Sequence, residues 1–147
     1  MLEGAIANEV QSILQSLLAE TRASRVTLRR GVSGGYVFPV TDEALAPGVA
    51  SLKEERTVDL RTQPVAREVQ RSGQVVQDDC LAANDDPAFQ QMLETYGGLA
   101  AQIVTAVVTD GGVAAIVSVH QLGSPRRWSE DEADACRRAA ARLAELL

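Results

Sequence analysis

The chain has 147 residues, a net charge of −6 and 46% apolar residues, of which few are aromatic. Its length suits one domain with one core, and no apolar run approaches the roughly 18 residues that span a membrane. The acidic balance argues against a protein that binds nucleic acid through its phosphates. The first ten residues lack the basic and apolar segments of a secretory signal, so we expect a soluble cytoplasmic protein.

The first third of the sequence predicts a helix and two strands. In residues 6–22 apolar side chains recur at helical spacing, and polar side chains occupy the opposite face. Residues 25–30, RVTLRR, alternate as a half-buried strand does. A turn at 31–35 leads to a second strand at 36–40, whose proline indicates an edge position or the end of the strand. Residues 41–61 show only a weak pattern: APG indicates a turn, VASL fits a short strand or a helix fragment, and no element is assigned there.

The middle of the chain predicts two shorter helices with a strand between them. Thr62 is the expected N-cap of a helix that Gly73 ends. A short strand over 74–79 then runs into an acidic loop. Asp86, which precedes a proline, is the expected N-cap of the next helix, and Gly97–Gly98 closes that helix.

The last third has the strongest patterns. The segments QIVTAVVT and VAAIVSVHQ flank DGG, which predicts a β-hairpin. In both segments the odd- and the even-numbered positions are apolar, so both faces of the sheet should be covered. Ser129 and Glu132 match a capping box that begins the closing helix. The elements together predict an α+β fold, in which an antiparallel sheet carries helices on both faces and the N- and C-terminal helices pack together on one of them.

Three stretches in this order resemble the GAF domain family: REVQRSGQVVQDD (67–79), AAQIVTAVVTDGGVAAIVSVHQ (100–121) and RRWSEDEADACRRAAARLAELL (126–147). The resemblance covers almost the whole chain and implies one GAF-like domain over residues 1–147. It also implies a six-stranded antiparallel sheet with the terminal helices on one face. On the other face, the middle helices and loops of ligand-binding members form a small-molecule pocket.

The function implied by this resemblance is that of a non-enzymatic sensory or regulatory domain. Such a domain would bind an unidentified small molecule and signal as a homodimer through its terminal helices, without a membrane or nucleic-acid partner. Two alternatives stay open: a redox enzyme similar to free methionine-(R)-sulfoxide reductase, which uses clustered cysteines, and a structural dimerisation module without a ligand. The NKFDE set of cyclic-nucleotide binders and the bilin-type cysteine context of phytochromes are both missing from the sequence.

The only histidine, His120, is the first candidate pocket residue. It shares strand parity with Ser118, so both side chains should point to the same face of the sheet. If that is the pocket face, the two residues offer an imidazole and a hydroxyl to a ligand. Otherwise His120 ends a strand and forms a local hydrogen bond or faces solvent. No cofactor is predicted; haem held by His120 is an option within the family that nothing around this residue selects.

The acidic loop supplies further candidates. Asp78 and Asp79 could contact a cationic or amine ligand, cap the next helix or form a solvated surface. Cys80 should have an exposable thiol in this loop, although the neighbouring carboxylates should raise its pKa and lower its reactivity. Cys136 lies in the apolar stripe of the last helix and should pack as a small hydrophobic residue. The wide separation of the two cysteines gives no metal signature.

Three more polar residues are possible anchors in an otherwise aliphatic pocket, which is a common composition for small-molecule sites: Tyr36, Tyr96 and Thr105. Each fits a core or surface position equally well. Trp128 precedes the Ser129 cap, where it should pack as a hydrophobic staple. The sequence contains no recognisable catalytic constellation, so no catalytic residue is predicted.

Overall fold

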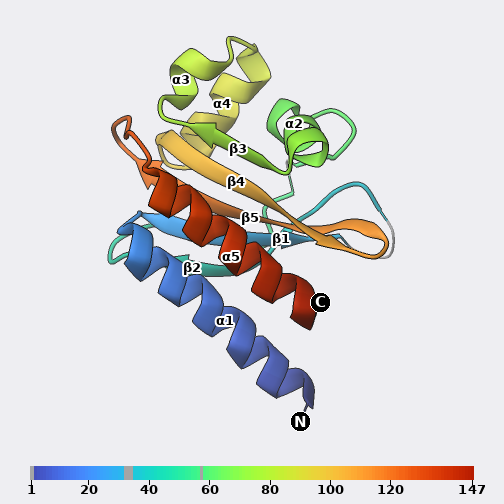
Figure 1. The fold of residues 1–147 in the computed structure, drawn as a ribbon. Coiled ribbons are helices and arrows are strands. Elements are labelled where there is room, and N and C mark those ends of the chain that lie inside the picture. The colour runs from blue at the N-terminus through green and yellow to red at the C-terminus, as the bar shows by residue number, and fades with distance from the viewer. Residues whose placement is uncertain (1, 32–34, 57) are drawn as a thin grey trace.

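The computed structural model describes residues 2–31, 35–56 and 58–147, which form a five-stranded antiparallel sheet between two helical layers (Figure 1). The elements are α1 (Leu2–Thr21), β1 (Arg25–Arg30), β2 (Val40–Leu45), α2 (Pro64–Ser72), β3 (Gln74–Gln77), α3 (Cys80–Ala83), α4 (Pro87–Thr95), β4 (Leu99–Thr109), β5 (Gly112–Leu122) and α5 (Glu130–Leu146). The strand order is β2-β1-β5-β4-β3, so β5 is the central strand. None of the described helices is long and apolar enough to cross a membrane.

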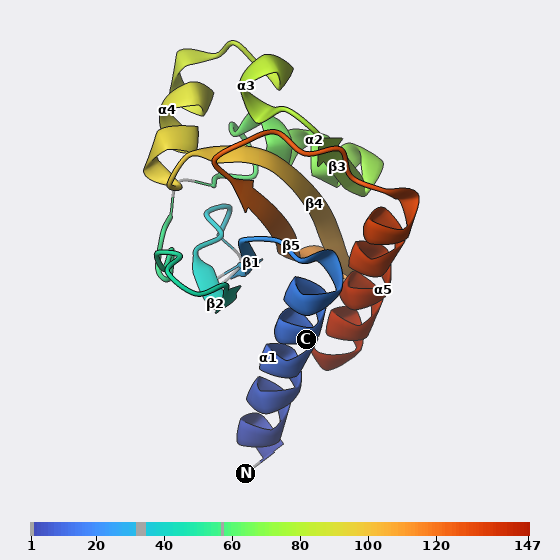
Figure 2. The ribbon, with the colours of Figure 1, turned by 90° about the vertical axis from the view of Figure 1, so that its left-hand side faces the viewer.

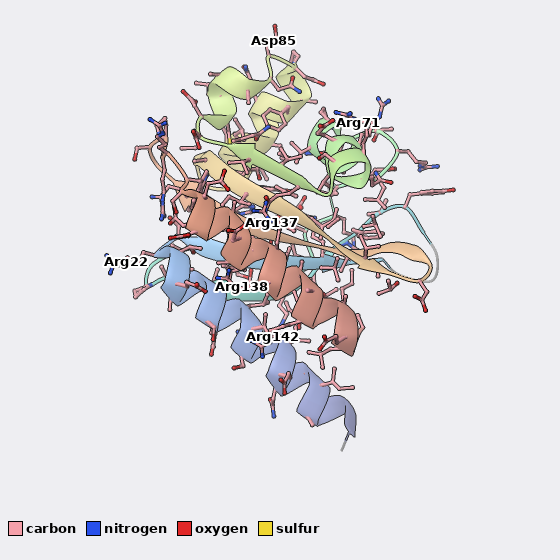
Figure 3. All side chains as sticks on the ribbon, viewed as in Figure 1. Arg22, Arg71, Asp85, Arg137, Arg138 and Arg142 are labelled. Carbon is pink, nitrogen blue, oxygen red and sulfur yellow. The ribbon has the colours of Figure 1, made fainter. Side chains whose placement is uncertain are left out.

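The two terminal helices lie side by side on one face of the sheet (Figures 1 and 2). The apolar stripe of α1 packs there with one face of the strands and with α5, in a cluster that includes Leu14, Leu28 and Leu143. The exposed side of this layer is polar, and Figure 3 shows arginines along the outer face of α5. Two of these arginines form ion pairs with α1, at 3.2 Å between Arg138 and Glu20 and at 3.7 Å between Arg142 and Glu9. These exposed pairs add little stability; apolar burial holds the layer together.

The opposite face of the sheet carries α2, α3, α4 and the segment between β2 and α2 (Figure 2). A second apolar cluster forms beneath them, with Val69, Phe89 and Leu93 among its members. This face differs from the first because buried arginine and histidine side chains, Arg25, Arg29 and His120, lie between the sheet and the helices.

Two expectations about the first half of the chain are wrong. The strand expected at 36–40 lies instead at Val40–Leu45, because Pro39 has no N–H for a ladder and regular pairing starts only after it. The six strands implied by the resemblance are five among the described residues. Between β2 and α2 the described chain is irregular: it forms one bridge, from Asp59 to Val37, and backbone hydrogen bonds that join Glu54 and Glu55 to Val40. Residues 32–34 of the expected turn lie outside the described part of the chain.

The helix boundaries agree with the sequence patterns except in two places. Gly73 ends α2 with a left-handed φ of 88°, and Asp86 caps α4. The capping box of Ser129 with Glu132 is also confirmed. However, α2 is capped by Gln63 rather than Thr62, since the side-chain Oε1 of Gln63 accepts from the backbone N–H of Ala66. The short helix α3 stands where a loop was expected.

Candidate functional site

Strand β1 buries two arginines and a threonine on the face away from the terminal helices. Val26 and Leu28 pack with α1 and α5, so the alternate residues point to the other side of the sheet. There Arg25, Thr27 and Arg29 are only 1%, 0% and 3% exposed. Charged residues are rarely this buried without partners, which makes their contacts the starting point of the site.

The guanidinium of Arg25 joins three segments of the chain. Its Nε donates to Nδ1 of His120 at 3.1 Å, and its two terminal nitrogens donate to the carbonyls of Ala50 at 3.2 Å and Tyr96 at 2.7 Å. Burial lowers the pKa of Arg25 to about 10, partly offset by the attraction of Glu43. The group therefore stays charged at neutral pH, yet within the described residues no carboxylate forms an ion pair with it.

His120 is neutral and its tautomer is fixed. Burial lowers the pKa of this ring well below 6.5, and the positive charges of Arg25 and Arg29 lower it further. Because Nδ1 accepts the hydrogen bond from Arg25, the single proton of the neutral ring resides on Nε2. His120 therefore presents an N–H donor on the side away from Arg25.

Arg29 forms the second half of the buried polar group. One terminal nitrogen donates to the backbone carbonyls of Phe38 at 3.0 Å and Glu55 at 3.1 Å. The other contacts the Glu55 carboxylate at 2.5 Å and also donates to the hydroxyl of Tyr96. That hydroxyl donates in turn to the Glu55 carboxylate at 2.8 Å. Arg29, Glu55 and Tyr96 thus fix the irregular segment before α2 onto the sheet.

A small cavity of about 30 Å³ lies beside this polar group. Its walls come from the sheet, α2, α4 and the segment before α2: Arg29, Val58, Gln63, Val65, Ala66, Met92, Tyr96, Gln102, Val104, Ile116, Ser118 and His120. Among the described residues, nothing accepts from Nε2 of His120 or bonds to the hydroxyl of Ser118. The buried hydroxyl of Thr27 also has no partner there. Thr27 is not among the residues that line the cavity, so it is the unused groups of His120 and Ser118 that give the cavity the polar character of a binding site.

A groove of about 410 Å³ runs between the start of α2 and helix α4, next to this cavity. Gln63 and Met92 line both spaces, and the Gln63 amide contacts the Met92 sulfur at 3.5 Å. The cavity itself has room for roughly one or two water molecules. A larger ligand would therefore have to part these two side chains or move the segment that carries Glu55.

Three of the residues that the sequence proposed for a pocket line this cavity: Tyr96, Ser118 and His120. His120 and Ser118 share a face, as their strand parity predicted. Tyr36 does not join them: it is 54% exposed, and the Arg61 guanidinium lies 4.6 Å from its ring centre. Thr105 lies on the terminal-helix side of the sheet, where its hydroxyl accepts from the Gln74 amide at 3.0 Å.

The acidic loop also lies away from the cavity, and its residues have structural contacts. Asp78 accepts from the backbone N–H of Trp128 at 3.1 Å, and Asp79 caps α3. Cys80 is fully buried in α3, where burial and then the charge of Asp79 raise the pKa of its thiol to about 12. The expectation of an exposable loop thiol is therefore wrong, because α3 turns this side chain into the second apolar cluster.

Sequence reasoning missed Arg25, Arg29, Glu55 and Gln102. The pattern RVTLRR predicts a half-buried strand with its polar side chains in solvent, whereas the structure buries most of them. The sequence did contain a signal for this burial. The hairpin is apolar on both sides, which indicates that both faces of the sheet are covered, and a strand inside such a sheet has its polar side chains buried too. No pattern in residues 41–61 pointed to Glu55.

The site does not fit a metal ion or haem. The described residues contain no group of three His, Cys, Asp or Glu side chains that could hold a metal. A haem iron would need the lone pair of Nε2, since Arg25 occupies Nδ1, but Nε2 carries the proton. The space beside His120 is also far smaller than a haem.

Comparisons with known proteins agree with this architecture. The family model for the GAF domain matches residues 6–147. The chain is similar to the blue-light absorbing PixJ GAF domain of Thermosynechococcus elongatus, at 24% identity over 97% of this chain and 89% of that one, with a TM-score of 0.75. It is also similar to the photoproduct state of GAF3 from Slr1393 of Synechocystis sp. PCC6803, at 16% identity over 95% and 90%, with a TM-score of 0.80.

A third similar structure is the far-red absorbing dark state of JSC1_58120g3 with bound biliverdin, at 16% identity over 99% of this chain and 97% of that one, with a TM-score of 0.76. Identities this low show a shared fold and nothing finer. No protein with a curated description matches the sequence significantly.

Proposed function

The chain belongs to the GAF domain family, and from this membership we propose that it is a sensory domain that binds a small molecule in the cavity beside His120. The observation that carries the proposal is the pair of unused donors, Nε2 of His120 and the Ser118 hydroxyl, which face one cavity from neighbouring positions of β5. Both groups border the cavity, so water can use them in the absence of a ligand, and a ligand that replaces this water has to provide matching hydrogen bonds. A ligand with a hydrogen-bond acceptor would satisfy both.

The ligand we propose is smaller than the biliverdin of JSC1_58120g3. Covalent attachment of a bilin needs a reachable thiol, but neither Cys80 nor Cys136 lines the cavity, and both are buried. The redox alternative is disfavoured for the same reason. The two cysteines belong to different apolar clusters on opposite faces of the sheet, so they are not placed to form the disulfide that such an enzyme uses.

A contact path supports transmission of binding from the cavity to the terminal helices. Gln102 lines the cavity and donates to the Gln77 side chain at 2.8 Å. The backbone carbonyl of Gln77 accepts from the indole N–H of Trp128 at 3.1 Å, just before α5. A ligand that moves Gln102 would therefore act on the start of α5. Such a shift requires the ligand to prefer one of two arrangements of this path.

Homodimerisation through the terminal helices is part of this proposal, and it has to use their exposed polar side. Leu17 and Leu143 are buried within the protomer and are not available to a partner. Light scattering at micromolar concentration should give the mass of a dimer, and Ala141→Arg on the exposed face of α5 should give a monomer. Ala82→Arg on α3 is the matched control and should leave the dimer intact. A wild-type monomer would contradict this part of the proposal.

A structural module without a ligand is the second candidate function, and the small volume of the cavity favours it. A thermal-shift screen of metabolites separates the two. Saturation at about 100 times Kd stabilises a protein by about 2.7 kcal/mol, which gives a clear rise in melting temperature. Ser118→Ala should reduce that rise, whereas Thr105→Val, which removes a buried hydroxyl from the opposite face, should not. If no compound stabilises the folded protein, the structural module is the better reading.

A further inference from the structure

We propose that Arg29 is the anchor for a ligand carboxylate, and that Glu55 occupies this anchor as an internal substitute until the ligand displaces it. The inference rests on the proposed function and specifies the chemistry of the ligand. Its starting point is the contact of the Arg29 guanidinium with the Glu55 carboxylate at the border of the cavity.

The two partners of this ion pair differ in their freedom to leave it. Arg29 lies on β1 between two neighbouring strands, and its side chain is 4% exposed. Glu55 lies on the irregular segment between β2 and α2, and its side chain is 13% exposed. The carboxylate can therefore turn into water, whereas the guanidinium cannot. An unpaired buried guanidinium is strongly unfavourable, so the pair would be exchanged for another and not simply broken.

The charge balance of this face selects an anionic replacement. Two buried guanidiniums, Arg25 and Arg29, stand against one ion-paired carboxylate, and Glu43 attracts Arg25 only at longer range. The neutral His120 and the Ser118 hydroxyl add donors that line the same cavity as Arg29. A carboxylate replaces the negative charge that Glu55 takes away from Arg29 and also brings acceptor oxygens. A cation would meet repulsion, and a neutral amide would leave Arg29 without a counter-charge.

The exchange would also change the fold locally. Arg29 holds the segment before α2 through both the carboxylate and the backbone carbonyl of Glu55. The Tyr96 hydroxyl bonds to the same carboxylate. When a ligand takes over Arg29 and Tyr96, the Glu55 carboxylate loses these two contacts, while backbone hydrogen bonds still join the segment to residues 36–40. Binding is thereby coupled to a loosening of the segment next to the cavity.

Fluorine NMR of protein labelled with 3-fluorotyrosine tests this exchange directly. The chain has two tyrosines, of which Tyr96 touches the ion pair and the exposed Tyr36 is an internal control. Sodium acetate is the probe, acetamide is its neutral counterpart, and chloride keeps the ionic strength constant. Acetate should shift the Tyr96 signal to saturation without moving the Tyr36 signal. Acetamide should move neither signal.

Glu55→Gln removes the internal competitor and should lower the acetate concentration for half-saturation about tenfold, as expected when a competing state is abolished. Glu54→Gln makes the same change of charge at the neighbouring exposed residue and should leave the titration unchanged. Arg29→Lys keeps the charge but loses the planar fork, so the acetate response should weaken at least severalfold. If Arg29→Lys does not fold, the comparison of the two glutamine variants still decides.

Equal responses to acetate and acetamide, or no gain in Glu55→Gln, would overturn the inference. This outcome differs from a failure of the proposed function. Suppose that a neutral metabolite raises the melting temperature of the wild type, that Ser118→Ala reduces this rise, and that acetate shifts the Tyr96 signal of neither the wild type nor Glu55→Gln. The cavity then binds a ligand, but Arg29 is not a carboxylate anchor.

Discussion

Replacing His120 by glutamine should remove a loss of stability that the wild-type protein suffers on mild acidification. In the folded chain the pKa of His120 lies well below 6.5, first because the ring is buried and then because Arg25 and Arg29 repel an added proton. In the unfolded chain the ring titrates near 6.5. Below this pH the unfolded state therefore binds a proton that the folded state does not, and folding becomes less favourable.

The size of this effect follows from the difference in proton binding. Each pH unit below the unfolded pKa costs about 1.4 kcal/mol, so the loss between pH 7.5 and pH 5.0 should be about 2 kcal/mol. Urea unfolding of the wild type and of His120→Gln at both pH values measures it. Because the chain has one histidine, the difference between the two losses isolates this ring. Equal losses in the two proteins would refute the assignment of a buried neutral imidazole.

Four further predictions concern backbone conformation, helix capping and thiol reactivity. Gly73→Ala should destabilise the protein by about 1 kcal/mol in urea unfolding, because φ is 88° there. The helical Gly4, with free space around it, should gain up to about 1 kcal/mol as alanine. Ser129→Ala should cost about 1 kcal/mol through loss of the capping box, by the same assay. Cys80 and Cys136, whose pKa values burial raises to about 12, should resist Ellman's reagent at pH 8 unless urea is added; a thiol that reacts in the native protein contradicts this.

The parts of the fold that the sequence predicted well are those set by local chemistry. The DGG turn fixes the hairpin of β4 and β5, and Asp86 and Ser129 cap their helices through their own side chains. The second strand was expected at 36–40 and lies at Val40–Leu45, because Pro39 separates residues 36–38 from the regular ladder.

The site was predicted only where strand parity determines it. His120 and Ser118 follow from alternation along one strand, whereas Tyr96 was a candidate only as a polar residue that fits a core or a surface position equally well. The position of Thr105 depends on which face of the sheet the odd-numbered residues of β4 meet, and the helices that cover this face come from the two ends of the chain. Arg25, Arg29 and Glu55 come together through segments that the sequence pattern does not connect. Tertiary contacts of this kind leave no local periodicity.

The most direct test of the ligand-binding account is a long-range ¹H–¹⁵N NMR spectrum of the single imidazole, recorded without ligand and with each compound that stabilises the protein. At pH 7 we expect the signature of a neutral ring protonated on Nε2, because Nδ1 accepts from Arg25. We expect the Nε2 signal to move when a ligand binds, because that N–H faces the cavity. A ring protonated on Nδ1, a charged ring, or an Nε2 signal unchanged by every stabilising compound would contradict the account.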